Sequence, residues 1–324
     1  MCTAIGFVSG NFYFGRTLDY EVSFGQKVVI TQRNYPFKFY MEGKNNSHSA
    51  IIGAAAVVDN YPLYFEGANE EGLCVAALNF VGNAEYFEEK EGFYNIAQYE
   101  FIPWLLSNYK SVAEVEKVLD RVNITNKNFS AQMPAARLHW LIADKEKSIT
   151  VESVKEGLKV YQNPLCVLSN NPPFEYQMFA LNNYMHLSAE APLDTFSPEI
   201  KLDRYSRGMG AIGLPGDNTS QSRFIRAAFV KSNTKKGENE NERISAAFHI
   251  FSSVEQRLGC TVLDDGSLDK TIYTACINAD KGVYYYTTYE NHAISAVSLE
   301  GVEKDGDGLF IYDMGKNEQI IRQN

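Results

Sequence analysis

Two continuous apolar segments constrain the fold of this chain more than any other feature of its sequence. Residues 51–58 (IIGAAAVV) and 72–80 (GLCVAALNF) are apolar at nearly every position and show no alternation of apolar and polar side chains. Such runs are typical of strands covered on both faces, or covered on one face and adjoining a layer boundary on the other. The two segments therefore predict a sheet inside a layered fold.

The remaining elements are predicted in blocks of one kind, with strands first, then a helix pair, then strands, two helices and strands again. The further predicted strands are 4–8, 12–14, 28–31, 138–143, 148–151, 158–161, 166–168, 271–278, 282–289 and 294–299. The predicted helices lie within 95–106, 111–122 (opened by a capping box at Ser111), 220–229 and 244–254. This order favours an α+β fold, in which helices pack on two stacked, largely antiparallel sheets, over alternating βαβ units.

Three stretches are expected to lie outside regular structure. Residues 15–19 (GRTLD) and the aromatic-rich residues 59–67 are predicted loops between strands. Residues 181–221 are polar and lack periodicity, which is typical of an extended excursion or a contact between subunits. We expect residues 1–324 to form a single domain, because β-rich layered folds reach this length as one unit.

Charge and composition bear on the partners of the chain. Its net charge is −10, with 30 Lys and Arg against 40 Asp and Glu, and phosphate binding needs clustered basic side chains, so no nucleic-acid partner is expected. No apolar run reaches the ~18–20 residues of a membrane helix, and the first residues lack the pattern of a secretory signal. We expect a cytoplasmic protein without a membrane partner. The five widely spaced cysteines have no histidine at ligand spacing and predict neither a disulfide framework nor a metal site, and no cofactor is expected.

Cys2 is the first candidate for chemistry. If Met1 is removed, Cys2 carries a thiol and a free α-amine on one residue. An α-amine titrates near ~7.7–8.0, so part of it is neutral at neutral pH and can take the proton of the thiol. No histidine stands at a recognisable catalytic spacing, which favours a nucleophile that needs none. The alternative is that a cysteine at position two is incidental.

Four other residues are candidates with equally plain alternatives. The hairpin formed by the first two predicted strands can bring Arg16 and Asp19 near Cys2, although each is also an ordinary surface charge. Asn79 closes a strand, where an amide often caps or turns the chain. Asn170 lies in a loop restricted by Pro172 and the proline after it, where its amide can face a developing oxyanion or simply form a turn.

Taken in order, these residues resemble a known family. The stretches that carry the resemblance are 1–3, 15–19, 78–80, 168–172, 213–217, 222–226 and 286–291. They resemble the choloylglycine hydrolases, the branch of the N-terminal nucleophile hydrolases that contains bile salt hydrolases and penicillin V acylases. The resemblance implies a four-layer αββα sandwich and a homotetramer, with 181–221 as the candidate assembly contact.

The resemblance also implies catalytic roles. Cys2, exposed by loss of Met1, would attack the amide carbonyl while its α-amine accepts and returns the proton. Arg16 beside the sulfur would favour the thiolate, and Asp19 would hold the α-amine by a charge-assisted hydrogen bond. The Asn170 side chain and the Asn79 backbone N–H would form an oxyanion hole. Arg223 would stabilise the charge of the site at longer range.

The substrate follows from the resemblance in the same way. Asn79 resembles the bile salt branch, because penicillin V acylases commonly have Tyr there. The implied substrate pocket is lined by Leu18, Tyr20, Phe24, Tyr61, Phe65, Phe129 and Met133. The expected function is hydrolysis of glycine- and taurine-conjugated bile acids through a Cys2 thioester, with amine N-acyl transfer as a side activity. The alternatives are a penicillin V acylase or other N-acyl amide hydrolase, and a catalytically silent bile-acid-binding or redox-sensing protein that retains Met1.

Overall fold

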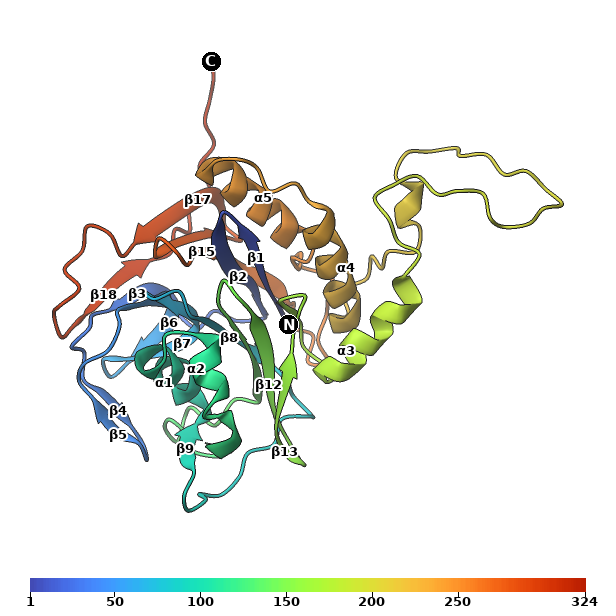
Figure 1. Cartoon of the computed structure of the whole chain (residues 1–324). Coiled ribbons are helices and arrows are strands. Elements are labelled where there is room, and N and C mark those ends of the chain that lie inside the picture. Colours follow the sequence, from blue (N-terminus) through green and yellow to red (C-terminus); the bar gives the residue numbers. More distant parts are fainter.

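The computed structural model describes residues 1–324 and contains two stacked sheets with helices on their outer faces (Figure 1). The six-stranded sheet has the order β14 (Val167–Leu168), β1 (Cys2–Ser9), β2 (Asn11–Tyr20), β15 (Lys270–Asn278), β16 (Val283–Thr288) and β17 (Asn291–Ser298). The eight-stranded sheet has the order β13 (Gly157–Gln162), β12 (Ser148–Val154), β11 (Leu138–Ala143), β8 (Cys74–Asn79), β7 (Tyr61–Asn69), β6 (Ile51–Val58), β3 (Lys27–Thr31) and β18 (Leu309–Asp313). All pairings within these two sheets are antiparallel.

Helices cover the outer faces of both sheets. The helices α1 (Phe101–Asn108) and α2 (Val112–Glu116) lie on the side of the eight-stranded sheet, and α4 (Ser220–Asn233) and α5 (Glu240–Ser252) pack on the six-stranded sheet. The helix α3 (Phe174–Ala180) contacts α4. The predicted α+β sandwich is therefore confirmed.

The two apolar segments behave as predicted, because each is covered on both faces. In β6, Ile52 and Ala54 belong to the core between the sheets, whereas Ile51 and Ala55 belong to the core under α1 and α2. Alternate residues of β8 divide in the same way. Since both faces are dry, neither strand shows the alternation of a strand with one solvated face.

The predicted loop at 15–19 is wrong, because these residues form the second half of β2. β2 pairs with β1 on one side and β15 on the other, with Cys2 opposite Leu18 and Ala4 opposite Arg16. Gly15 allows this close pairing, since a Cβ there would lie 1.9 Å from the carbonyl oxygen of Ala275. Ladder hydrogen bonds on both edges hold a polar sequence in a central strand.

The predicted loop at 59–67 is also wrong, because residues 61–69 form β7. Only Asp59 and Asn60 turn, and their φ values of 51° and 60° are those of a two-residue hairpin turn. Asp-Asn between two β-prone segments was the local signal for this hairpin. The aromatic side chains of 61–65 lie on a strand.

The first predicted helix pair is shorter than its sequence pattern. Ile96 lies in the strand β9 (Tyr94–Ala97), which pairs in parallel with β10 (Val122–Thr125). Ser111 caps α2, since its side chain accepts a hydrogen bond from Glu114 N. The reciprocal half of the predicted capping box is absent, because the Glu114 side chain accepts from Lys110 N and not from Ser111 N. Val122 nevertheless belongs to a strand, because tertiary pairing of β9 and β10 overrides the helical spacing. The other short strands, β4 (Phe37–Phe39) and β5 (Gly43–Asn45), form a separate hairpin.

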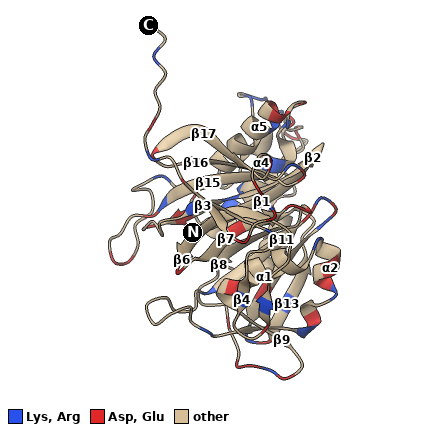
Figure 2. Ribbon diagram, turned by 90° about the vertical axis from the view of Figure 1, so that its left-hand side faces the viewer, with Lys and Arg blue, Asp and Glu red and all other residues tan.

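Residues 181–219 are irregular, as predicted, apart from the 3-10 turns Leu181–Tyr184 and Met209–Ala211, whereas the last two residues of the predicted 181–221 excursion already belong to α4. The segment extends far from the two sheets (Figure 1, yellow), and apolar side chains such as Leu193 and Phe196 are exposed on it. Lys and Arg are interspersed with Asp and Glu over the rest of the ribbon (Figure 2). None of the helices has the length and apolar character needed to cross a membrane.

Candidate active site

Cys2 is the first residue of β1, an inner strand of the six-stranded sheet, and its side chain is buried between the sheets. Directly opposite residues of an antiparallel pair point to the same face. The register of β1 and β2 therefore places the side chains of Cys2, Leu18, Ala4 and Arg16 on the inner face. Cys74, Cys166 and Cys276 are buried, as expected for small apolar side chains, and all five cysteines are free.

Arg16 is fixed between the sheets by carbonyl groups of the opposite sheet. Its Nη1 donates hydrogen bonds to Ala77 O (2.5 Å) and Phe65 O (3.2 Å), and the side chain is 1% exposed. Burial works to lower the pKa of this guanidinium, but the negative charges of Cys2, Tyr273, Glu66 and Asp19 when ionised raise it above its usual value. Arg16 therefore remains a cation facing the thiol.

A buried carboxylate, that of Glu66, pairs with the Arg16 guanidinium. Glu66 Oε2 lies 3.8 Å from Arg16 Nε. The hydroxyls of Tyr273 and Tyr284 donate to the two oxygens of Glu66 at 2.7 and 2.6 Å. Burial raises the pKa of Glu66, and Arg16 and the two hydroxyls oppose that rise.

Asp19 lies on the other face of β2, toward α4. Its carboxylate accepts hydrogen bonds from the hydroxyls of Thr271 (2.6 Å) and Thr17 (3.2 Å), and Arg223 Nη1 lies 3.9 Å from Asp19 Oδ2. Burial raises the pKa of Asp19, while Arg223 and the N-terminal ammonium group oppose the rise. With Met1 in place, the structure gives this carboxylate no hydrogen bond from Cys2 N, so its role as the amine partner stays a prediction.

Asn170 is the residue that joins the N-terminus to the rest of the site. Its Oδ1 accepts hydrogen bonds from Cys2 N (2.7 Å) and Arg223 Nη2 (2.8 Å), and its Nδ2 donates to Asn79 O (2.8 Å). The loop is held in turn by Ser220, whose Oγ accepts from Asn170 N at 2.7 Å. Cys2, Asn79, Asn170 and Arg223 thus meet at one point, although they come from four separate elements.

Arg223 contacts the N-terminal residues directly. It lies in the first turn of α4, where the side chain of Thr219 caps the helix. Its Nη1 donates to Cys2 O and to Thr3 Oγ1, each at 2.5 Å. Burial lowers the pKa of Arg223, and Asp19, Cys2 and Asp269 oppose that change. The sequence predicted only a longer-range role for this side chain.

The predicted pocket residues fall into two aromatic groups. Tyr20, Phe24 and Phe65 form the first, with ring centroids 4.8 Å apart for Tyr20 and Phe24 and 5.6 Å apart for Phe24 and Phe65. Burial raises the pKa of Tyr20 and the Asn79 side chain opposes that rise, which places this group beside the candidate catalytic residues. Leu18 is buried in the core with Cys2 and contributes no open surface.

The second aromatic group contains Tyr61 and Phe129, whose ring centroids lie 5.8 Å apart. Tyr99 completes it, 5.2 Å from Phe129. Met133 O accepts a hydrogen bond from Phe129 N, so these two residues belong to one turn. No sequence pattern pointed to Tyr99, because its place depends on how the 98–100 turn meets β7.

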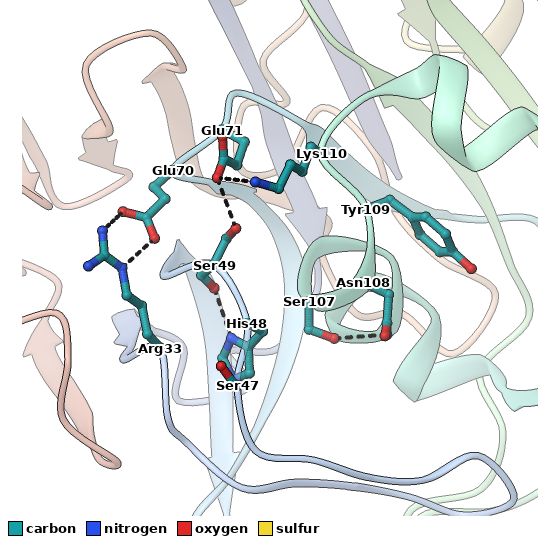
Figure 3. A pocket seen from close by; sticks show the side chains of 10 residues that line it. All are labelled: Arg33, Ser47, His48, Ser49, Glu70, Glu71, Ser107, Asn108, Tyr109 and Lys110. Carbon is teal, nitrogen blue, oxygen red and sulfur yellow. Dashed lines mark hydrogen bonds and ion pairs between the residues drawn. The ribbon is translucent and has the colours of Figure 1, made fainter.

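A polar hollow of about 420 Å³ lies elsewhere, between residues 47–49, 70–71 and 107–110 (Figure 3). Its charges pair with each other, since Arg33 contacts Glu70 (2.7 Å) and Lys110 contacts Glu71 (3.1 Å). None of the predicted site residues lines this hollow. The structure contains no group of three or more His, Cys, Asp or Glu side chains arranged to hold a metal ion.

Comparisons with known proteins identify the class and then the family. Two solved structures share the whole architecture. One is the C2A mutant of the conjugated bile acid hydrolase from Clostridium perfringens, with a TM-score of 0.92 and 36% identity over 100% of both chains. The other is a penicillin V acylase from Agrobacterium tumefaciens, with a TM-score of 0.76 and 20% identity over 98% of this chain and 92% of the other. The fold is that of the N-terminal nucleophile hydrolases.

The family is shown by sequence. Residues 2–312 match the profile of the linear amide C–N hydrolases, choloylglycine hydrolase family. The chain is 50% identical over 324 residues to a bile salt hydrolase/transferase from Lactiplantibacillus plantarum, with 100% of both chains covered. This chain therefore belongs to the choloylglycine hydrolase family and is an amide hydrolase.

Proposed function

We propose that this enzyme hydrolyses the amide bond of glycine- and taurine-conjugated bile acids through a thioester on Cys2. The observation that carries the proposal is the convergence of Asn170 and Arg223 on the backbone of Cys2, with the buried cation Arg16 on the thiol side. The 50% identity to a bile salt hydrolase/transferase supports the substrate class.

The chemistry begins with removal of Met1. Cys2 N, now part of a peptide bond, would become an α-amine that keeps Asn170 Oδ1 as its hydrogen-bond acceptor. This amine takes the proton of the thiol as the sulfur attacks the substrate carbonyl, and then gives that proton to the departing amino group. Water, deprotonated by the same amine, hydrolyses the thioester and releases the bile acid.

Donors around Cys2 would stabilise the tetrahedral intermediate. The side chain of Asn170 and the backbone N–H of Asn79 are the proposed oxyanion donors, and the two residues already contact each other through Asn170 Nδ2 and Asn79 O. To bind the oxyanion, the side-chain amide of Asn170 would have to break its hydrogen bond to Asn79 O or donate the second hydrogen of Nδ2. Arg223 holds Asn170 and Cys2 O in place and adds positive charge.

The first aromatic group, Tyr20, Phe24 and Phe65, is the proposed wall for the steroid, since it lies beside Asn79 and is only partly buried. A rigid apolar slab suits such a wall, because burial of apolar surface stabilises a complex by ~25 cal/mol per Å². Tyr61, Phe129 and Met133 are proposed to line the pocket further from the thiol.

A substrate panel tests the proposal. Purified protein that begins at Cys2 is incubated with glycocholate, taurocholate and penicillin V, and products are measured by mass spectrometry. We expect cholate from both conjugates at higher kcat/KM than penicillin V hydrolysis. Preferred turnover of penicillin V would replace this function by that of a penicillin V acylase, for which the shared fold is the present support.

Amine N-acyl transfer is proposed as a side activity of the same thioester. An amine that replaces water at the acyl-enzyme would form a new conjugate, and the relative from Lactiplantibacillus plantarum is named a hydrolase/transferase. Excess amino acid added to the glycocholate reaction should give new cholyl conjugates. Their absence would limit the enzyme to hydrolysis.

A chain that retains Met1 would lack the amine that the mechanism requires. We propose that this form is catalytically silent, because Cys2 N is then an amide. We also propose a homotetramer that uses 181–221 as a contact, and a cytoplasmic location. The exposed apolar side chains of that segment support the assembly.

A further inference from the structure

The N-terminal ammonium group lies in a polar recess beside β2. With Met1 present, this ammonium donates a hydrogen bond to Asp19 O (2.5 Å) and forms an ion pair with Asp269 Oδ2 (3.4 Å). Met1 O accepts from Asp19 N at 2.8 Å, so the first residue is held at both ends. Asp269 precedes β15 and is almost fully buried.

Two side chains in this recess have polar atoms without a partner. They are Asp269, whose Oδ1 is unpaired, and Gln256, whose Nε2 is unpaired. Their exposed fractions are 2% and 1%. Buried polar atoms almost always have partners, because an unpaired one destabilises the fold. Both side chains therefore offer polar atoms inside this part of the fold in addition to the groups that bind the Met1 ammonium.

The recess is connected to the candidate active site by hydrogen bonds. Thr271 Oγ1 donates to Asp19 Oδ1 (2.6 Å) and accepts from Gln256 N (2.7 Å). Asp269 N donates to Thr261 O, and the Thr261 hydroxyl donates to Gln256 Oε1. Asp269 and Asp19 thus belong to one buried network.

The charged and titratable groups around Asp269 come from three elements. Asp19 and Tyr20 face it from β2, Arg223 faces it from α4, and the N-terminal ammonium lies against it. The Arg223 guanidinium is occupied by Cys2 O, Thr3 Oγ1 and Asn170 Oδ1. The ammonium group is therefore the cation in direct contact with Asp269.

Removal of Met1 transfers the ammonium group to Cys2, one residue along the chain. The new α-amine lies within about one Cα–Cα step (~3.8 Å) of the old one. Removal of Met1 takes away the cation that Asp269 contacts, and a buried carboxylate left without a cation is strongly unfavourable, which favours an attraction between Asp269 and the Cys2 ammonium.

We propose that Asp269 is an electrostatic partner of the Cys2 α-amine in the mature enzyme, additional to Asn170 and Asp19, and holds the proton on that amine. This inference rests on the proposed N-terminal nucleophile. The amine must be neutral to accept the proton of the thiol and protonated to release the leaving group. The charge of Asp269 extends the protonated form to higher pH and so sets the acid limb of the activity profile.

The test compares Asp269→Asn with wild type in chains cleaved from a fusion so that Cys2 is the first residue. Two pH profiles are recorded, kcat/KM for glycocholate and the rate of Cys2 alkylation by iodoacetamide. The alkylation is measured by intact mass in a Cys260→Ser background, because Cys260 is the exposed cysteine. Both acid limbs should move down by about one pH unit, as expected when an opposite charge a few ångströms away is removed.

Two further variants keep the result interpretable. Asp280→Asn removes a carboxylate at the far end of the same sheet, where Asp280 accepts from Phe12 N, and should leave both profiles unchanged. Gln256→Glu adds a carboxylate to the recess and should move both limbs up, even if Asp269→Asn fails to fold.

Unshifted profiles in Asp269→Asn and Gln256→Glu would overturn the inference and leave the proposed function intact. If the two variants shift the alkylation profile but the wild-type chain hydrolyses no conjugated bile acid, the inference about Asp269 stands and the proposed function is refuted.

Discussion

Replacing Glu100 by glutamine should remove a pH-dependent destabilisation of the fold. Glu100 ends the 98–100 turn before α1, and its side chain is 1% exposed. Its oxygens accept hydrogen bonds from Tyr40 N (2.7 Å) and Ala97 N (3.3 Å), and no cation pairs with it. Burial, reinforced by the charge of Glu42 and opposed by these two N–H groups, raises the pKa of Glu100 from its usual 4.5 to about 7.

The sign and size of the effect follow from proton linkage. Between pH 4.5 and about 7 the folded chain binds the Glu100 proton more tightly than the unfolded chain, so the free energy of unfolding falls as pH rises through this window. Each unit of pKa difference between the folded and unfolded chains changes the free energy of unfolding by ~1.36 kcal/mol. The rise from 4.5 to about 7 in the pKa of Glu100 therefore corresponds to about 3 kcal/mol. Glu100→Gln abolishes this loss, at a pH-independent cost of about 1 kcal/mol for the hydrogen bond from Ala97 N.

Urea denaturation from pH 4.5 to 8.5, followed by fluorescence of the buried Trp104 and Trp140, measures the effect. The unfolding free energy of wild type minus that of Glu100→Gln should fall by about 3 kcal/mol over the range. The exposed Glu89→Gln is the matched control and should follow wild type at every pH. A difference between wild type and Glu100→Gln that stays constant with pH would show that Glu100 does not titrate differently in the folded and unfolded chains.

Three further predictions concern the site and the assembly. Asn170→Ala should lower kcat for glycocholate by ~10²–10³, the usual loss for an oxyanion donor, and a kcat near wild type would remove Asn170 from the mechanism. Phe65→Ala should raise KM for glycocholate about tenfold, because a partly buried ring loses ~1–2 kcal/mol of apolar contact, whereas an unchanged KM would place the steroid elsewhere. Phe196→Glu, on the protruding segment 181–221, should reduce the mass in light scattering without lowering Tm, and an unchanged oligomer would exclude this contact.

Local sequence patterns were sufficient to predict the layers of the fold and the proximity of Cys2 and Arg16. Strand length, continuous apolarity and the hairpin at Gly10 determine how β1 and β2 pair, and the register then places both side chains on the inner face. The predictions of loops at 15–19 and 59–67 were wrong for the same reason. Polar or aromatic residues in central strands are stabilised by neighbours distant in sequence, such as β15 beside β2.

The supporting groups of the site could not be derived from sequence. Glu66 meets Tyr273 and Tyr284 across the gap between the sheets, more than 200 residues away in sequence. Asp269 reaches the N-terminus through a loop ahead of β15. No local pattern encodes such contacts. The single-domain organisation, the catalytic roles and the tetramer stay predictions.

In the proposed mechanism Cys2, freed of Met1, is both nucleophile and base. The most direct measurement is the release of cholate and glycine from glycocholate by protein whose intact mass shows that it begins at Cys2, beside Cys2→Ala prepared in the same way. We expect equal amounts of both products from the wild-type chain and none from Cys2→Ala, with the two proteins equally stable. Hydrolysis by Cys2→Ala, or by a chain that still carries Met1, would contradict it.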